Sequence, residues 1–256
     1  MTVENKKHEF DFEKVFNPDD YLYFYEDIIP EEQTQKEIDF LVKELGFDYV
    51  GKVLDLACGH GRHANPLAEL GFDVTGVDIT KGFLEIAEKE AKEKRLNIKY
   101  VQGDMREITY VNEFERGLLL FTAFGYFEDK ENFKVLQNIV KALKPGGLFC
   151  FDIPNRDVFL KNFLPFIVRE KGSDLMIDRN TFDVITGCIR CRRIEIRDGN
   201  RKDKNFFIRL YNFTEIKDLL ERAGLKIEKV FGDWDSSPLT NDSSKMIIIS
   251  KTEKGE

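Results

Sequence analysis

Long apolar runs are missing from this chain of 256 residues. The longest, residues 118–121 and 246–249, fall far short of the roughly 20 residues that a membrane-spanning helix needs. The first residues contain no apolar stretch of the kind that forms the centre of a secretory signal. Internal repeats and low-complexity tracts are absent as well. We therefore expect a cytoplasmic globular protein that has no membrane partner.

Cysteine and histidine are scarce. The chain has four cysteines, too few for a disulfide framework in a protein of this length. Cys188 and Cys191 have the C-x-x-C spacing of a metal site, but a zinc ion needs three or four protein ligands. No second cysteine pair exists, and the three histidines lie far from this pair in the sequence. We expect structural roles for the cysteines and no metal site.

An excess of positive charge is also missing, because 39 Lys and Arg residues stand against 47 Asp and Glu, for a net charge of −8. This balance argues against an extended surface that neutralises phosphates. A basic stretch over residues 190–204 is interrupted by Glu195, Asp198 and Asp203. Such mixed charge favours a solvated strand face, so nucleic acid is disfavoured as a partner.

The sequence does contain a regular alternation of apolar strands and amphipathic helices. Ile38, Leu41 and Leu45 repeat at helical spacing, and Thr80 stands where its side chain can cap a helix. Regular alternation implies right-handed βαβ units on a parallel sheet. The expected strands span residues 53–57, 72–77, 98–101, 117–121, 148–153, 225–231 and 245–250. The expected helices span residues 31–45, 62–70, 133–143 and 214–223, with one more after Thr80.

The alternation of strand and helix patterns stops after Pro154. Residues 155–210 lack a long helical period and contain alternating segments, and Asp198-Gly199 is a hairpin turn signal between two of them. This pattern predicts an antiparallel insertion. The chain then divides into an N-terminal segment (1–30), a core (31–154), the antiparallel insertion (155–210) and a C-terminal completion of the core (211–256).

A glycine turn follows the first expected strand of the core. Gly59-His60-Gly61-Arg62-His63-Ala64 fits the loose pattern G-x-G-x-x-G/A, and Asp78 ends the next strand at the spacing used to hold ribose hydroxyls. Taken alone, this pattern fits NAD as well as S-adenosylmethionine. Strand-turn-glycine patterns also occur where no ligand binds.

Three features favour the methionine-bearing cofactor. Asp55 lies in the strand, where a carboxylate would repel a pyrophosphate but suits the cationic amino group of a methionine moiety. The helix that follows Gly61 presents backbone N–H groups to an anion, here a carboxylate. Asp104 and Met105 follow the third strand, where an acid and a backbone N–H can recognise the adenine edge.

At this point the sequence resembles a class I S-adenosylmethionine-dependent methyltransferase. The resemblance rests on the glycine turn and on further motifs in the family's order and approximate spacing, which continue through residues 209–211, 232–234 and 244–249. These further motifs are Val77-Asp78-Ile79, Gly103-Asp104-Met105, Phe121-Thr-Ala-Phe-Gly-Tyr126 and Leu143-Lys-Pro-Gly-Gly147. More narrowly, the chain is similar to a small-molecule-type group of largely unassigned substrate. Pattern and resemblance together predict an α/β fold, with a doubly wound Rossmann-like, mostly parallel seven-stranded sheet and an antiparallel β insertion before the last helix.

The resemblance implies a set of cofactor-binding residues. Those expected at the methionine end of S-adenosylmethionine are Asp55, Ala57, Gly59 and Gly61. Tyr25, from the N-terminal segment, is expected as a lid contact.

The other end of the cofactor implies a second set of residues. Asp78 would accept hydrogen bonds from both ribose hydroxyls, and Ile79 would lie against one adenine face. Asp104 and the backbone of Met105 would bind the adenine edge, and Phe121 would line the site of the donated methyl group. The product expected after transfer is S-adenosylhomocysteine.

The acceptor is much less determined. Candidate acceptor-side residues follow the fourth and fifth strands or the insertion, because ligands gather beyond the carboxyl ends of such strands. These candidates are Tyr126, Asp152, Asn155, Arg209 and Tyr211. We expect the insertion to cover the pocket and a small molecule to be the acceptor. No catalytic residue is assigned, since a general base is needed only if the acceptor must lose a proton.

Other functions stay open at this stage. The chain could use NAD as an oxidoreductase, methylate RNA or protein, or bind S-adenosylmethionine without catalysis. Methylation of bases is disfavoured, because residues 121–125 read Phe-Thr-Ala-Phe-Gly and lack the Asn/Asp-Pro-Pro-aromatic motif used on amino groups of bases. The oligomeric state is not predicted.

Overall fold

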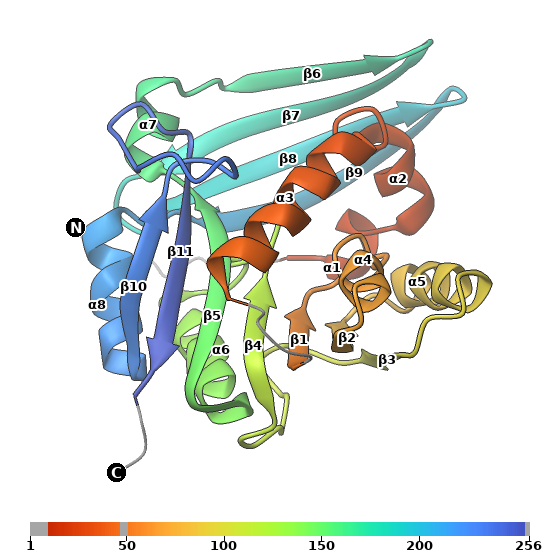
Figure 1. Ribbon diagram of the computed structural model, residues 1–256. Coiled ribbons are helices and arrows are strands. Elements are labelled where there is room, and N and C mark those ends of the chain that lie inside the picture. The colour runs from red at the N-terminus through yellow and green to blue at the C-terminus, as the bar shows by residue number, and fades with distance from the viewer. Residues whose placement is uncertain (1–9, 47–50, 254–256) are drawn as a thin grey trace.

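The computed structural model describes residues 10–46 and 51–253, and its centre is a seven-stranded sheet in the order β10-β11-β5-β4-β1-β2-β3 (Figure 1). The strands from β3 to β5 run parallel, β11 runs antiparallel to β5, and β10 runs antiparallel to β11. The strands are β1 Lys52–Leu56, β2 Asp73–Asp78, β3 Ile98–Gln102, β4 Phe114–Leu119, β5 Leu143–Pro154, β10 Leu225–Phe231 and β11 Lys245–Thr252. The mostly parallel α/β architecture expected from the sequence is confirmed.

Helices cover both faces of this sheet. Their bounds are α3 Glu31–Glu44, α4 Ala64–Glu69, α5 Lys81–Glu93, α6 Asp129–Ala142 and α8 Phe213–Ala223. Apolar side chains of α3 and α4, such as Leu41 and Leu67, form one core with the sheet. Side chains of α6 and α8, such as Leu136 and Leu220, form a second core on the opposite face. Because both faces are covered, most positions of the central strands β1 and β4 are buried and apolar, as in buried parallel strands generally.

Local chemistry fixes the ends of the helices that flank the functional edge of the sheet. Asn212 and Glu215 form a reciprocal capping box at the start of α8, and Gly224 ends it at a left-handed φ of 92°. Helix α2 (Pro18–Tyr25) begins with proline at its first position, and the Asn17 side chain accepts a hydrogen bond from the Asp20 N–H. These signals are readable in the sequence.

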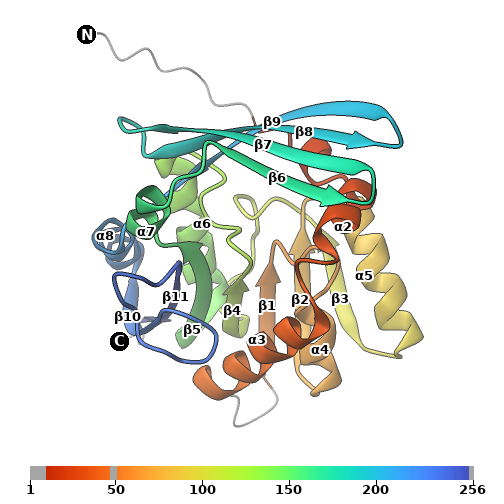
Figure 2. The ribbon, with the colours of Figure 1, turned by 90° about the horizontal axis from the view of Figure 1, so that it is seen from above.

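A second sheet lies across the carboxyl ends of the parallel strands (Figure 2). It consists of four antiparallel strands in sequence order: β6 Phe166–Lys171, β7 Asp174–Asp183, β8 Cys188–Arg197 and β9 Asn200–Arg209. The turn between β8 and β9 is Asp198-Gly199, with φ values of 49° and 73°. The predicted antiparallel insertion before the last helix is therefore confirmed, and its position over the strand ends matters for the site.

Several local predictions were wrong. No helix was expected before residue 31, yet the N-terminal segment contains α1 (Phe12–Val15) and α2; residues 1–9 lie outside the described part of the chain. A short helix, α7 (Arg156–Lys161), precedes the second sheet because Asn155 caps it. Helix α4 begins two residues later than expected, at Ala64, and Thr80 occupies the cap position of α5 without a side-chain capping bond.

Strand β5 also begins earlier than the sequence indicated. The expected helix ended at residue 143 and the expected strand began at residue 148, but Leu143 already pairs with Phe114 of β4. A register shift then lets Arg116 pair with Leu148, so the intervening glycine-containing residues bulge without ending the strand. Within residues 10–46 and 51–253, no helix is long and apolar enough to cross a membrane.

Candidate functional site

A cavity with an empty volume of about 920 Å³ lies where the carboxyl ends of β1, β2 and β4 face the N-terminal helices. Ligands bind in this position in open α/β sheets, because loops there surround a crevice that the strands leave open. Residues from five parts of the chain meet around it. The sequence-predicted residues that line it are Asp55, Ala57, Gly59, Asp78, Ile79, Asp104, Met105, Phe121 and Tyr126.

The glycine turn forms the floor of this cavity and needs backbone conformations that few residues adopt. Ala57, Gly59 and Gly61 have φ values of 51°, 56° and 85°. A Cβ at Gly61 would lie 2.6 Å from the Tyr100 hydroxyl oxygen, so a larger residue does not fit there. The turn is closed by a hydrogen bond of 3.1 Å from the Gly61 N–H to the Cys58 carbonyl. Gly61 thus supports the turn from behind and does not line the cavity.

Asp55 is a buried acid without a partner. Its side chain is at the cavity wall with 1% of the residue exposed, and its Oδ2 atom has no hydrogen-bond partner among the described residues. Burial, and then the nearby charge of Asp78, raise the pKa of the Asp55 carboxyl to about 7, against a smaller opposing effect of Arg62. An unsatisfied buried carboxylate is costly unless a cation meets it, so this geometry points to a cationic ligand group.

Arg62 was not predicted as a site residue, although it belongs to the glycine turn and lines the cavity. Its Nη1 atom lies 2.6 Å from Oε2 of Glu37 in α3, and the Nε2 atom of His63 lies 2.7 Å from the same oxygen. Burial raises the pKa of Glu37, but the bonds and charges of His63 and Arg62 outweigh it and hold the pKa at about 2. The Nη2 atom of Arg62 is buried and has no partner among the described residues.

Asp78 stands at the end of β2 and already accepts two backbone hydrogen bonds. The Gly59 N–H donates to Oδ2 at 2.8 Å, and the Thr80 N–H donates to Oδ1 at 2.7 Å. Burial raises the pKa of Asp78 above its usual value, against these bonds, which lower it. Each carboxylate oxygen keeps a lone pair for a further donor, so the side chain can hold the turn and accept ligand hydroxyls together.

Asp104 has a partner that the sequence did not reveal. Arg106 donates to both of its carboxylate oxygens, with Nε at 3.0 Å from each and Nη2 at 2.5 Å from Oδ2. Burial raises the pKa of Asp104, but these bonds from Arg106 outweigh it, so the net pKa is lowered. The Arg106 guanidinium also stacks 4.2 Å from the centre of the Phe127 ring, and Asn138 donates to the Met105 carbonyl at 3.2 Å. Asp104 is therefore held ionised and fixed in place.

The loop after β4 contains two non-glycine residues in left-handed backbone conformations. Phe121 and Thr122 have φ values of 60° and 56°. Asp152, at the end of β5, accepts the Phe121 N–H at 2.6 Å and the Thr122 N–H at 3.2 Å. Asp152 was expected to contact the acceptor; its carboxylate is instead buried and holds this strained loop. Burial raises the pKa of Asp152 to about 6.

Aromatic residues close the cavity above Phe121. Tyr126 and Tyr21 line it, and the Tyr21 ring stacks on Tyr25 at 4.4 Å between centres. Tyr25 lies edge-on to Phe121 at 6.5 Å and accepts a hydrogen bond of 3.1 Å from Nη2 of Arg193 in β8. Tyr25 does not line the main cavity. It lines an adjoining open groove that shares Tyr21, Ile29, His60 and Arg62 with the cavity.

Comparison with known proteins decides between the two cofactors that the glycine turn allows. Residues 53–147 match the family described as the methyltransferase domain. A methyltransferase of Bacillus subtilis named YqeM is 24% identical over 212 residues, which cover 80% of this chain and 85% of YqeM. The cypemycin N-terminal methyltransferase of a Streptomyces species is 26% identical over 208 residues, 77% of this chain and 81% of that protein. The chain is an S-adenosylmethionine-dependent methyltransferase, and its residues 53–147 match the methyltransferase domain.

Solved structures agree with the fold of this methyltransferase. An S-adenosylmethionine-dependent methyltransferase from Clostridium acetobutylicum superimposes with a TM-score of 0.81 at 18% identity, covering 92% of this chain and 98% of that one. CalS10 of Micromonospora echinaspora, solved with S-adenosylmethionine bound, gives a TM-score of 0.65 at 18% identity and covers 87% and 91% of the two chains. These likenesses extend beyond the matched domain, so the second sheet is part of a fold shared with these proteins.

The remaining predicted acceptor residues lie away from the cavity of the methyltransferase. Asn155 caps α7, accepting the Asp157 N–H at 3.2 Å. The Arg209 guanidinium bonds Asp129 at 3.0 Å, and the Tyr211 hydroxyl donates to the same carboxylate at 2.8 Å. None of these three lines the cavity, because each is occupied by packing and hydrogen bonds that join α6, α7 or α8 to the sheets. Among the residues that the structure describes, no group of three or more His, Cys, Asp or Glu is placed to hold a metal ion.

Proposed function

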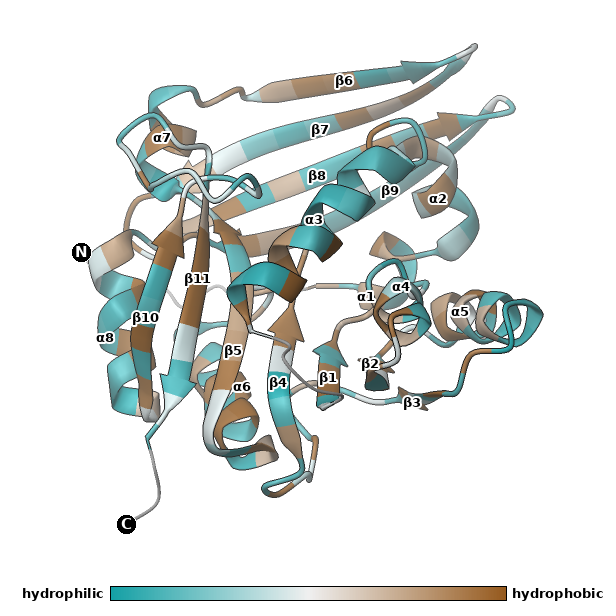
Figure 3. Ribbon diagram, viewed as in Figure 1, coloured by the Kyte–Doolittle hydropathy of each residue, from teal (hydrophilic) through white to brown (hydrophobic). Residues whose placement is uncertain are grey.

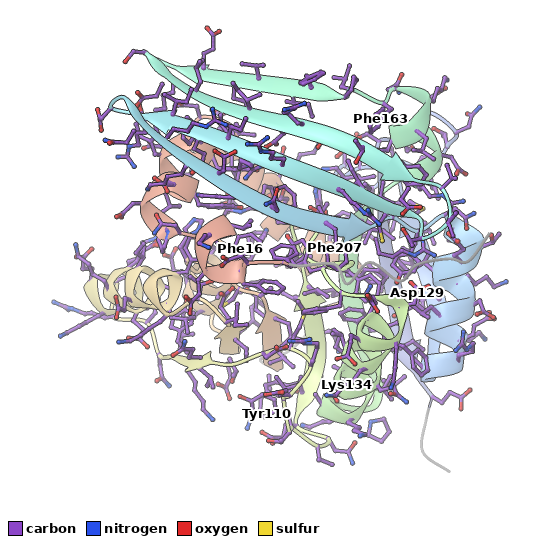
Figure 4. All side chains as sticks on the ribbon, turned by 180° about the vertical axis from the view of Figure 1, so that it is seen from behind. Phe16, Tyr110, Asp129, Lys134, Phe163 and Phe207 are labelled. Carbon is purple, nitrogen blue, oxygen red and sulfur yellow. The ribbon has the colours of Figure 1, made fainter. Side chains whose placement is uncertain are left out.

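We propose that this methyltransferase moves a methyl group from S-adenosylmethionine to a small-molecule acceptor that is enclosed in the cavity. The observation that carries the proposal is the aromatic cover formed by the N-terminal helices. Phe12 and Phe16, with Tyr21 of α2, line the cavity. Figure 4 shows Phe16 where the antiparallel sheet meets the parallel core. Covered cavities of this kind fit a small molecule and leave little room for a polymer chain.

The methionine end of the cofactor fits two unsatisfied atoms of opposite charge. Asp55 Oδ2 and Arg62 Nη2 are both buried without a partner, and both residues line the cavity. We propose that Asp55 holds the amino group and Arg62 the carboxylate, which extends the role predicted for Asp55, Ala57, Gly59 and Gly61. When bound, S-adenosylmethionine supplies a methyl group activated by a sulfonium. Glu37 fixes the Arg62 side chain from behind, so Arg62 is preorganised for an anion.

The nucleoside end fits the residues after β2 and β3. We propose that Asp78 accepts the ribose hydroxyls with the lone pairs that its backbone bonds leave free. Ile79, which is 38% exposed, offers an apolar surface to the adenine. Asp104 and the Met105 N–H would bind the adenine edge, with Asp104 kept ionised and oriented by Arg106.

On the acceptor side the chain contributes position more than acid–base chemistry. Burial raises the pKa of the Tyr126 hydroxyl, so this group stays protonated near neutral pH and acts as a hydrogen-bond donor or a packing surface. Phe121 is 37% exposed at the cavity, and its backbone is fixed by Asp152. Holding the acceptor atom roughly 3 Å from the methyl carbon supplies much of the rate of such a displacement.

Relatives that act on small molecules support this choice of acceptor class. CalS10 is described as an amino pentose methyltransferase, and a sugar N-methyltransferase, KedS8, superimposes with a TM-score of 0.68. A ubiquinone biosynthesis O-methyltransferase of Rickettsia canadensis is 31% identical over 105 residues, 41% of this chain and 43% of that protein. Their acceptors are chemically diverse, so they support a small molecule without naming one.

The test is a transfer assay with S-adenosylmethionine labelled on its methyl group. The purified protein is incubated separately with metabolites, RNA and protein fractionated from the host, and the Asp78→Ala variant is the control. We expect label in the metabolite fraction that disappears with the control. Label found only in RNA or protein would contradict the small-molecule proposal. Tight binding of S-adenosylhomocysteine with no label in any fraction would instead favour a non-catalytic binding protein.

A further inference from the structure

The antiparallel sheet β6–β9 carries charged side chains on the face where such a sheet usually carries apolar ones. Its inner face, which is turned toward the rest of the protein, carries buried charged side chains at alternate positions. These are Asp174, Asp178, Arg193, Glu195 and Lys204, each at most 6% exposed. A sheet that covers a core with one face usually buries apolar residues there and turns polar residues to water. The charged inner face raises the question of what the outer face is built for.

The inner charges are satisfied within the chain. Arg193 bonds Asp178 through Nε at 2.7 Å, and Lys204 lies 2.5 Å from Glu195. Helix α2 supplies the other partners, since Lys202 donates to Asp20 at 2.7 Å and Tyr23 donates to Asp174 at 2.8 Å. The charges of the inner face are therefore paired with one another or with α2.

The outer face is apolar at its centre. Strand pairing sets Val168, Ile177 and Ile194 side by side across β6, β7 and β8, and the next outward row sets Leu175 beside Ile196. Phe166 and Val168 are 57% and 53% exposed. Figure 3 shows the hydrophobic segments of β6 and β7 in brown. We call these six residues the outer patch: Phe166, Val168, Leu175, Ile177, Ile194 and Ile196.

No described helix or strand covers the outer patch. In Figure 2 the helices and the seven-stranded sheet all lie on the other side of β6–β9. Contiguous apolar surface of this kind is rare on a soluble monomer and usually marks an interaction site. Three strands of ten residues and one of six, with a rise of ~3.3 Å and a spacing of ~4.8 Å, give this face a flat area of about 600 Å². This area is of the same order as the ~800 Å² per partner that a standard stable interface buries.

We propose that the outer patch binds a second copy of this chain, face to face, as a two-fold symmetric dimer. A two-fold interface must be complementary to itself. Glu170 and Arg179 fit this condition, because they lie at opposite ends of the patch on its outer face: Glu170 pairs with Leu175, and Arg179 pairs with Phe166. Neither forms an ion pair with another described residue, whereas Arg192 is paired with Asp203 at 2.6 Å.

The two-fold arrangement then satisfies both free charges. It sets Glu170 of one protomer against Arg179 of the partner subunit, and the reverse pair forms at the other end. Two packed sheets lie about 10 Å apart, a distance at which the apolar side chains of the outer patch interdigitate. The dimer would place the two cavities on opposite outer sides, because each lies beyond the inner face of its own sheet.

The first test is the mass of the full chain in solution, measured by sedimentation over a range of concentrations. We expect a dimer of about twice 29.9 kDa. Ile194→Glu puts a charge at the centre of the patch and should give a monomer. Val184→Glu is the matched control, since Val184 is an apolar residue, 83% exposed, in the turn between β7 and β8 and outside the patch; it should remain a dimer.

The second test uses exposed residues whose replacement spares the fold. Glu170→Arg and Arg179→Glu should each raise the dimer dissociation constant at least tenfold, because each sets two like charges together twice in the dimer. The double variant E170R/R179E restores opposite charges and should dimerise close to wild type. A wild-type chain that stays monomeric at every concentration overturns the proposal. A dimer that is unaffected by these three variants and by Ile194→Glu overturns it as well, because its interface then lies elsewhere.

Discussion

Replacing Asp55 by asparagine should weaken binding of S-adenosylhomocysteine at pH 8 and, at the same pH, stabilise the free protein. The substitution keeps the size of the side chain and removes its charge. In the free protein that charge is buried, 1% exposed, with one oxygen unpartnered. In the complex, by our proposal, the same charge meets the amino group of the ligand. The two effects therefore have opposite signs, which a merely structural residue would not show.

The magnitude follows from the pKa of this carboxyl, which burial raises from 3.8 to about 7. A raised pKa means that the folded state holds the proton more tightly, so stability is full below pH 3.8 and is lost as pH rises through 7. At 1.36 kcal/mol per pKa unit, this loss reaches about 4 kcal/mol at most. The asparagine variant carries no charge at this position and does not lose this stability at pH 8. For binding, loss of a charge-assisted bond of about 1.5–3 kcal/mol predicts a 10- to 100-fold weaker Kd.

The pH dependence of binding gives a sharper signature. At pH 6 roughly a tenth of Asp55 is ionised in the free wild type, so its Kd for S-adenosylhomocysteine should be about tenfold higher than at pH 8. The Asp55→Asn variant should show no such change between pH 6 and 8. Calorimetric titration measures the binding, and thermal unfolding at pH 5 and pH 8 measures the stability.

A matched control for stability is Asp20→Asn. Asp20 is also buried, 3% exposed, but the bonds and charges of Lys202 and Lys204 outweigh its burial and lower its pKa. Neutralising it should destabilise the protein at pH 8, opposite to Asp55→Asn. The reasoning fails if Asp55→Asn binds S-adenosylhomocysteine with wild-type affinity and an unchanged pH dependence, or if it lowers the stability of the free protein at pH 8.

Three further substitutions test other parts of the site. Asp78→Ala should weaken cofactor binding by about 3 kcal/mol, since it removes two charge-assisted bonds; calorimetry showing unchanged affinity would mean that the ribose lies elsewhere. Gly61→Ala should lower the free energy of unfolding by about 1–3 kcal/mol, because its Cβ would lie 2.6 Å from the Tyr100 hydroxyl oxygen. Gly71→Ala is the control, since a Cβ at Gly71 meets open space, and thermal unfolding should show a smaller loss of stability for it. Asp152→Ala leaves two backbone N–H groups unpaired and should lower stability by about 1–3 kcal/mol. It should also lower the rate of methyl transfer in the labelled-donor assay. Normal activity would show that the loop keeps its conformation without Asp152.

The order of strands and helices was predictable because each element carries its own periodic pattern and its own end signals. Asp198-Gly199 marked its hairpin, and Gly224 marked the end of α8, through backbone conformations that few other residues adopt. Strand β5 was predicted too short because its first residues pair through a bulge, and a bulge depends on the neighbouring strand. Helices α1 and α7 were missed since they are four and six residues long, too short for a period to show.

For the site residues, too, positions set by a local motif could be predicted from the sequence, whereas contacts set by tertiary packing could not. Asp55 shortly precedes the glycine turn and Asp78 ends the next strand, so the motif and its spacing were enough to place them at one cavity. Arg62 could have been singled out from the same turn, but its partner Glu37 lies in α3 and no local pattern joins them. Asp152 was rightly placed at the end of the fifth strand, yet its bonds to the backbone after β4 depend on tertiary packing. A sequence motif gives the position of such a side chain but not the group it contacts.

The contacts between α2 and the antiparallel sheet have a consequence for turnover. Tyr25 is tied to Arg193, Tyr23 to Asp174 and Asp20 to Lys202, so the helix that covers the cavity is fastened to three strands of the sheet beyond it. The helix cannot move alone without breaking these partly buried ionic and hydrogen bonds. We therefore predict that the sheet and the helix tilt together as one body when product is released. We expect release to depend on solvent viscosity, as large concerted motions do, and the exchange of ligand to be slower than its small size suggests.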